Sequence, residues 1–163
     1  MNIALMPLPK PDRQNQFLAD HAKLLLDSFA SLTGKALIDP TLSAIEQAQQ
    51  LFEAPFAVLS HNTAPDPIFT YGNQMALQIF GLTWEELTQM PSRLSTEPIH
   101  QAERQHLLTM AIRQGYVDDY GGVRITKTGR RFLVEQATVW NLLDEAGHLL
   151  GQATLFSHWI FLD

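Results

Sequence analysis

The 163-residue sequence predicts an α+β domain, in which helices cover one face of a five-stranded antiparallel sheet and further helices precede it. Three observations predict this fold class. Apolar residues have helical spacing in the first third of the chain, short segments separated by glycine and proline fill the middle, and three strand-like runs joined by tight turns end it. Successive strands joined by tight turns pair antiparallel, so the last third predicts a meander.

Two helices are predicted in the N-terminal part. Between residues 16 and 33, apolar residues recur every three or four positions, and Gly34 follows as a helix terminator. Asp39 and Pro40 are typical of a helix start and predict a second helix that reaches Phe52. The pattern changes to strand-like runs after that point. We therefore predict a helical extension over residues 1–54 and a main domain over residues 55–163.

The middle of the chain predicts two strands and a series of helices. The apolar runs at residues 56–59 and 68–71 are the two strands. The helix signals that follow are a helical pattern over residues 74–80 ended by Gly81, a capping box of Thr83 and Glu86, and a longer helix over residues 99–114 ended by Gly115.

The three C-terminal strands are predicted at residues 120–126, 131–143 and 149–161. With a period of two, both faces of the 131–143 strand are mostly apolar. A sheet with two apolar faces needs cover on both sides. The helix at residues 16–33 is predicted to supply the second cover, either by folding back or by exchange within a homodimer.

Composition excludes several function classes. The chain has 17 acidic and 11 basic residues and a net charge of −6, which argues against binding to nucleic acid and to anionic membranes. No apolar run approaches the roughly 20 residues that span a bilayer, so we expect a cytoplasmic protein. The absence of cysteine excludes disulfides, thiolate metal sites and covalent flavin or bilin attachment.

Several short motifs point to one family. They are Asp66-Pro67-Ile68-Phe69, Asn73-Gln74 with Leu77, Ser92-Arg93, Glu97-Pro98-Ile99-His100, Glu103-Arg104, Gly129-Arg130, Glu135-Gln136-Ala137, Trp140 and Trp159. From about Phe56 onward they resemble the MEKHLA domain, a branch of the PAS-like superfamily. Its members include short stand-alone bacterial proteins, which this chain resembles, and the C-terminal parts of plant class III homeodomain-leucine zipper transcription factors.

The resemblance implies a sensory module that binds a small molecule noncovalently and signals through dimer or partner contacts. In a PAS-like fold the ligand lies between the sheet and the helices. The candidate ligand-binding residues are Phe69, Tyr71, Asn73, Phe80, Trp84, Arg93, His100, Arg104, Glu135 and Trp140. A guanidinium such as Arg93 or Arg104 matches an acidic ligand well. The alternative is that the aromatic residues fill the core and the charged residues form a solvated helix face.

Cofactor chemistry is only partly constrained by the sequence. His100, Glu103 and His106 could approach one metal, but the matching second set of ligands is absent, so we predict no metal site. Light-oxygen-voltage (LOV) photochemistry is excluded, because its flavin adduct needs a cysteine. A noncovalent flavin stays open, as does a haem bound through His61, His100 or His106.

Two other function classes remain open at this point. One is a small acid/base enzyme that uses a carboxyl group of Glu97, Glu103 or Glu135, although a protein without catalysis is the favoured prediction. The other is a purely structural dimerisation module with a filled core. The basic residues Arg124, Lys127, Arg130 and Arg131 are predicted to form a solvated hairpin turn rather than a nucleic-acid site.

Overall fold

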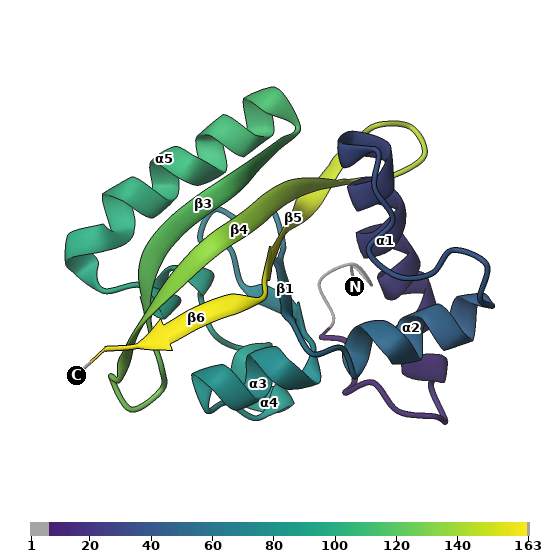
Figure 1. Ribbon diagram of the computed structural model, residues 1–163, viewed down its shortest axis with the longest axis horizontal. Helices are drawn as coiled ribbons and strands as arrows, with labels where there is room; N and C mark the ends of the chain where they lie inside the picture. The colour runs from purple at the N-terminus through teal and green to yellow at the C-terminus, as the bar shows by residue number, and fades with distance from the viewer. Residues whose placement is uncertain (1–6, 163) are drawn as a thin grey trace.

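The computed structural model describes residues 7–162, and its centre is one antiparallel sheet (Figure 1). The strands lie in the order β2, β1, β5, β4, β3, and β6 also pairs with β4. Their bounds are β1 Ala57–His61, β2 Phe69–Gly72, β3 Tyr116–Ile125, β4 Arg131–Leu143, β5 Leu149–Phe156 and β6 His158–Phe161. The predicted fold class is confirmed.

The sixth strand is a continuation of the fifth. Thr138 of β4 lies opposite Leu155 of β5, and Glu135 lies opposite His158 of β6, so the pairing register is the same on both sides of the break. The single strand predicted over residues 149–161 is therefore present, with an interruption at Ser157.

Helices from the N-terminal part cover one face of the sheet (Figure 1). After a 3₁₀ turn, η2 Gln16–Leu18, come α1 Ala19–Thr33 and α2 Ala44–Phe52. The indole N–H of Trp140 on β4 donates to the carbonyl oxygen of Leu25 on α1 at 3.2 Å, and its ring meets the Phe29 ring edge-on at 5.0 Å. The same chain therefore supplies the cover that the apolar outer face needs, as the fold-back alternative predicted.

The start of α2 differs from the prediction. Ser43 caps the helix, because its hydroxyl oxygen accepts from the backbone N–H of Glu46 at 3.2 Å. The carboxylate of Asp39 instead accepts from the backbone N–H of Thr41 at 2.9 Å and closes a local turn. The predicted cap at Asp39 is wrong, since aspartate stabilises an isolated turn by the same kind of bond that it uses at a helix start.

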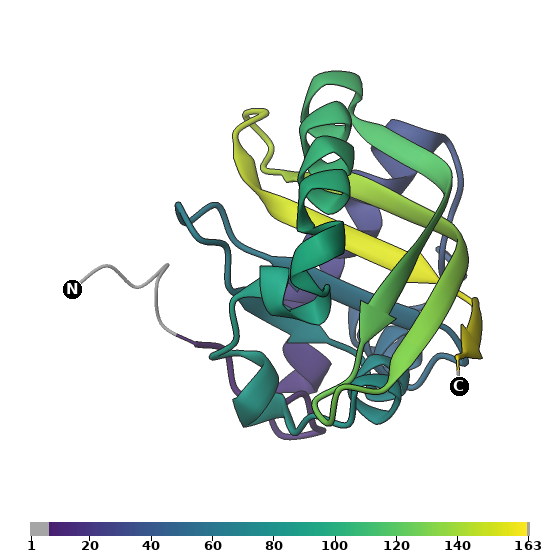
Figure 2. The same ribbon diagram turned by 90° about the vertical axis from the view of Figure 1, so that its left-hand side faces the viewer.

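The remaining helices lie on or beside the opposite face. They are α3 Gln74–Phe80, α4 Trp84–Leu87, the 3₁₀ turn η3 Ser92–Ser95 and α5 Pro98–Gln114. Figure 2 places α5 in front of the sheet and the N-terminal helices behind it. The capping box of Thr83 and Glu86 is present, and Gly81 ends α3 as predicted.

A bulge in β4 decides which side chains face α5. Gln136 has a positive φ of 55°, and the register against β3 shifts between Ala137, opposite Tyr120, and Val134, opposite Gly122. The extra residue exchanges the two faces of the strand at this point. Val134 and Ala137 consequently share the face toward α5, whereas the uninterrupted period of two predicted opposite faces for them.

The N-terminal helices and the sheet share one apolar core. Buried residues from both sides of residue 54, such as Leu25, Leu51, Val58 and Phe132, belong to the same cluster. A smaller, separate cluster lies beneath α5 and consists of Leu107, Leu108, Ala111 and Val139. The packing of α5 on the sheet is thus distinct from the main core.

Candidate functional site

A cavity of about 40 Å³ lies between α5 and the inner face of the sheet. A volume of this size holds only a few water molecules. Residues from β1, β2, β3, β4, β5, α3, η3 and α5 surround it: Leu59, Ser60, His61, Phe69, Phe80, Ser95, Arg104, Leu107, Leu108, Tyr120, Arg124, Val134, Ala137, Val139, Thr154 and Phe156. The wall is mainly apolar, with a few polar and charged groups.

Arg104 enters this wall because of its place on α5. It lies three, four and seven residues before Leu107, Leu108 and Ala111, which form the buried face of the helix. Burial, followed by the charge of nearby Arg124, lowers the pKa of the Arg104 guanidinium to about 10, so it stays protonated at neutral pH. No hydrogen bond or ion pair within residues 7–162 involves its guanidinium. The site therefore contains a partly buried cation without a counter-charge.

Arg124 reaches the cavity from β3 beside Tyr120. Its guanidinium donates to the Tyr120 hydroxyl at 3.3 Å and to its neighbour's backbone carbonyl oxygen, that of Val123, at 2.9 Å. Gly122 lies between them on the strand, and a Cβ there would come within 2.7 Å of the Tyr120 hydroxyl and 3.0 Å of Arg124. The absence of a side chain at Gly122 therefore leaves space for the contact between Tyr120 and Arg124.

His61 contributes an unpartnered polar atom to the wall. The side chain is 7% exposed, and its Nδ1 lies 2.9 Å from the carbonyl oxygen of Asn62. A carbonyl only accepts, so Nδ1 carries the proton in the neutral ring and Nε2 is left as an acceptor. Nε2 is buried and has no hydrogen-bond partner. Burial lowers the pKa of His61 to about 4, and the ring is uncharged at neutral pH.

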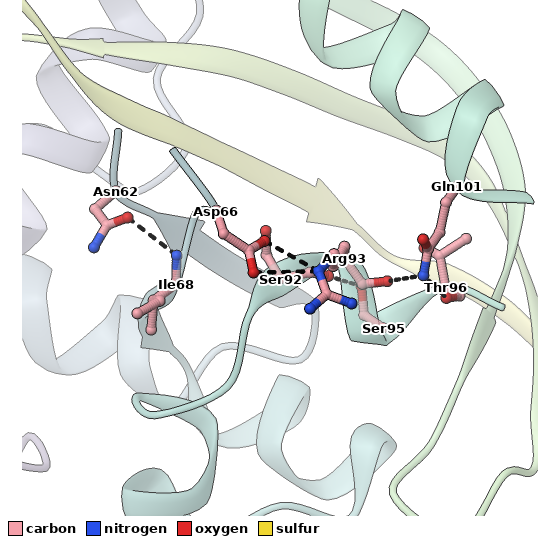
Figure 3. A network of polar contacts seen from close by, with 8 residues as sticks. All are labelled: Asn62, Asp66, Ile68, Ser92, Arg93, Ser95, Thr96 and Gln101. Atoms are coloured by element: carbon pink, nitrogen blue, oxygen red, sulfur yellow. Dashed lines mark hydrogen bonds and ion pairs between the residues drawn. The ribbon is translucent and has the colours of Figure 1, made fainter. Parts of the chain in front are cut away.

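A polar network fixes the loop that carries Ser95 to the cavity (Figure 3). The Arg93 Nε donates to the Asp66 carboxylate at 3.1 Å, and Gln101 of α5 donates to the carbonyl oxygens of Arg93 and Thr96, each at 3.2 Å. The Ser95 hydroxyl donates to the carbonyl oxygen of Ser92 at 2.7 Å. Arg93 thus anchors η3 through its exposed ion pair and does not line the cavity.

Of the ten predicted ligand-binding residues, Phe69, Phe80 and Arg104 line the cavity. Two aromatic residues pack elsewhere: the Tyr71 and Trp84 rings meet edge-on at 5.7 Å, and the Trp84 indole N–H donates to the carbonyl oxygen of Leu8 at 2.9 Å. Together with Trp140 against α1, these residues fill the core.

The remaining predicted residues have other surroundings. Asn73 is fully buried and bridges four backbone groups near the start of α3. His100 lies on α5 with its Nδ1 4.0 Å from the Glu103 carboxylate, and Glu135 is exposed opposite His158. Within residues 7–162, no group of three or more histidine or acidic side chains is placed to hold a metal ion.

Sequence reasoning missed part of the site. The predicted ligand-binding residues do not include Tyr120 and Arg124, and the sequence predicts a solvated hairpin turn for Arg124. The available signal was the period of two in Tyr120, Gly122 and Arg124, which puts both polar side chains on one strand face across a glycine. His61 was considered only as a haem ligand.

Comparison with solved structures defines the class of fold. A PAS domain from Colwellia psychrerythraea aligns with a TM-score of 0.61 at 14% identity, covering 72% of this chain and 94% of that chain. A fungal LOV photoreceptor aligns with a TM-score of 0.56 at 18% identity, covering 85% and 88%. The chain therefore has a PAS/LOV-like fold.

The chain belongs to the MEKHLA domain family, because the family model matches residues 19–161. The homeobox-leucine zipper protein ATHB-14 of Arabidopsis thaliana is 32% identical over 142 residues, which cover 83% of this chain and 16% of that protein. For ATHB-9 of the same plant the identity is 31% over 121 residues, with 70% and 14% covered. The chain spans less than a fifth of these relatives. The family match starts within α1, earlier than the predicted Phe56.

The cavity does not fit a flavin or a haem. Sites for ligands of drug size enclose roughly 300–1,000 Å³, far more than the 40 Å³ present here. The sequence also lacks the cysteine required for a flavin adduct. Of the three histidines considered for haem, only His61 lines the cavity. The residues present therefore favour a much smaller ligand.

Proposed function

We propose that this protein is a PAS-like sensory module that binds a small molecule noncovalently between α5 and the sheet and signals through dimer or partner contacts. The observation that carries the proposal is the partly buried Arg104 guanidinium, which has no hydrogen bond or ion pair among the described residues and lies at the wall of one cavity together with the buried, unpartnered Nε2 of His61. Buried polar groups are nearly always hydrogen-bonded, so unpartnered groups around a cavity favour an occupant.

The other function classes receive less support. Glu97 pairs with Arg131 at 2.7 Å, and Glu103 and Glu135 are exposed, so none of the three proposed acid/base residues lines the cavity. A purely structural module would have little use for a cation held beside an apolar space. These observations favour binding over catalysis.

The second part of the proposal concerns the surface through which the module signals to a partner. The apolar outer face that suggested a homodimer is covered by α1 of the same chain. Exposed apolar side chains remain on α5, where Ile99 is 82% and Ile112 is 51% exposed. Because α5 also lines the cavity, a ligand that shifts this helix would change the surface offered to a second copy or another protein. Sedimentation at tens of micromolar protein distinguishes these two partners, because a second copy gives a dimer and a different protein partner leaves a monomer.

Three finer inferences stay predictions. They are the stand-alone bacterial type, the cytoplasmic location and the absence of nucleic-acid and membrane partners. Within the part of the chain that the structure describes, no helix has the length and apolar character needed to cross a bilayer.

Native mass spectrometry tests ligand binding directly. Protein purified without denaturation is expected to carry a mass that disappears on denaturation, and Ala137→Leu is expected to lack it, because Ala137 is buried at the cavity wall. Overpacking costs about 1–3 kcal/mol, so a thermal melt checks that the variant folds. Thr154→Ile is a second filling variant, and Ala30→Leu, at an exposed position of α1, is the matched control.

Two outcomes would contradict the proposal. One is a native mass equal to the denatured mass, together with no thermal shift for any metabolite tested. The other is a retained ligand that both filling variants keep at the level of the Ala30→Leu control, which would locate the binding site outside the cavity.

A further inference from the structure

The positive charges at the cavity indicate the charge of its ligand. Arg104 and Arg124 reach the same cavity from α5 and β3, and no carboxylate side chain lines it. None of the ion pairs within residues 7–162 involves either arginine. Two like charges beside an apolar space repel each other, and an anion placed between them would relieve that repulsion.

The hydrogen-bonding capacity of the two guanidinium groups is largely unused. Each guanidinium has five N–H donors. Arg124 uses donors to Val123 and Tyr120, whereas Arg104 makes no hydrogen bond within the described residues. A planar carboxylate matches the geometry of a guanidinium and accepts two parallel bonds from it. The site thus offers donors and positive charge together.

The rest of the wall limits the body of the ligand. Leu59, Phe69, Phe80, Leu107, Leu108, Val134, Ala137, Val139 and Phe156 make most of the lining apolar. A phosphate or sulfate ion has no apolar part with which to contact these side chains. A short aliphatic chain attached to a carboxylate matches both the apolar wall and the volume of about 40 Å³.

We propose that the cavity selects a small aliphatic carboxylate, which accepts hydrogen bonds from Arg104 and Arg124 and places its short apolar chain against the apolar wall. A carboxylate has no N–H or O–H to donate, so the two arginines determine this selectivity and the Nε2 acceptor of His61 takes no part in it. This inference rests on the proposed ligand-binding function and names the chemical class of the ligand. Propionate is the smallest probe that combines a carboxylate with a chain of this kind.

Calorimetric titration at constant ionic strength compares propionate with its neutral isostere, propionamide. Saturable binding of propionate is expected, with propionamide and phosphate each bound at least about tenfold more weakly, since bonds to a charged group contribute roughly 1.5–3 kcal/mol. Equal affinity for propionamide would overturn the inference, because it would mean that the site does not select negative charge.

Substitutions of the two cavity arginines test whether the selectivity for propionate arises in the cavity. Arg104→Gln and Arg124→Gln are each expected to weaken propionate binding at least about tenfold. Arg113→Gln, on the exposed side of the same helix, is expected to leave the affinity within about twofold. Without propionate, Arg104→Gln is expected to melt no lower than wild type, because the substitution removes a repelling charge. Unchanged propionate affinity in both cavity variants would contradict the proposal.

Failure of this inference and failure of the proposed function give different results. A neutral ligand retained in native mass spectra, with no binding of acetate, propionate or butyrate, would refute the carboxylate while leaving the sensory module intact. No retained mass and no saturable binding of any probe would refute both.

Discussion

Acidification from pH 7 to pH 4 is expected to remove a large part of the folding free energy, through His21 of α1, which contacts β1, and His61 of β1. Burial lowers the pKa of both His21 and His61 from 6.5 to about 4. His21 lies on α1 with its Nε2 3.1 Å from the Ser60 hydroxyl, and its ring lies 5.5 Å from the Tyr71 ring. Neither imidazole has an anionic partner in the residues described.

The direction of the pH dependence follows from which state, folded or unfolded, binds protons. Between pH 6.5 and pH 4 the unfolded chain takes up protons on these imidazoles while the folded chain does not, so the free energy of unfolding falls as the pH falls. The stabilising contribution is fully present above pH 6.5. The loss at pH 4 is about 3 kcal/mol for each imidazole and roughly twice that for the pair.

Urea denaturation at several pH values measures this loss. Wild type is expected to lose about half of the contribution between pH 6.5 and pH 5, before exposed carboxyl groups titrate appreciably. His21→Gln is expected to roughly halve the pH dependence, whereas His106→Gln, on the exposed side of α5, is expected to keep it. A free energy of unfolding that is constant between pH 7 and pH 5 would refute the neutral buried state of these rings.

Replacement of Asn73 by alanine is expected to lower the free energy of unfolding by about 4 kcal/mol. The Asn73 Oδ1 accepts from the backbone N–H groups of Val58 at 3.0 Å and Ala76 at 3.1 Å. Its Nδ2 donates to the carbonyl oxygens of Leu51 at 3.0 Å and Phe56 at 2.7 Å. The alanine variant leaves these buried groups without partners at the junction of α2, β1 and α3.

Ser43→Ala is the matched control for this variant. Ser43 also caps a helix, but its position is exposed and its hydroxyl accepts one recorded bond, so a loss of about 1 kcal/mol is expected. Guanidinium denaturation followed by circular dichroism compares the two. A loss in Asn73→Ala no larger than in Ser43→Ala would mean that the buried bridge contributes little to stability.

The fold was predictable because its signals are local. Helical spacing, the capping box of Thr83 and Glu86, and the turn sequences between the last strands each depend on a few neighbouring residues, and the structure has the corresponding elements. The prediction of the α2 N-cap failed because the side chains of Asp39 and Ser43 can both accept a capping hydrogen bond. The local sequence does not distinguish between these two starts, and in the structure α2 packs against α1 and η2.

The site was less predictable because it depends on long-range geometry. The bulge at Gln136 exchanges the faces of β4 on which the following side chains lie. An alternating sequence pattern does not show where such a bulge occurs. Trp140 and Tyr71 have the residue type of a ligand pocket, but each fills the core. Arg104 was predictable from its residue type, because a guanidinium on a helix matches an acidic ligand. Arg124 was missed because the period of two shows that it shares a strand face with Tyr120, but not that this face meets the cavity beside α5.

Methyl-resolved NMR during a titration with propionate is the most direct test of the central claim, that the space between α5 and the sheet is the ligand site. Saturable shifts are expected, and they should be largest for methyl groups at the cavity wall, such as those of Leu107, Leu108 and Val139. The methyl groups of Leu25 and Leu51, in the core on the other face, are expected to move least. Saturable shifts centred on Leu25 and Leu51, with the cavity methyl groups unchanged, would contradict it.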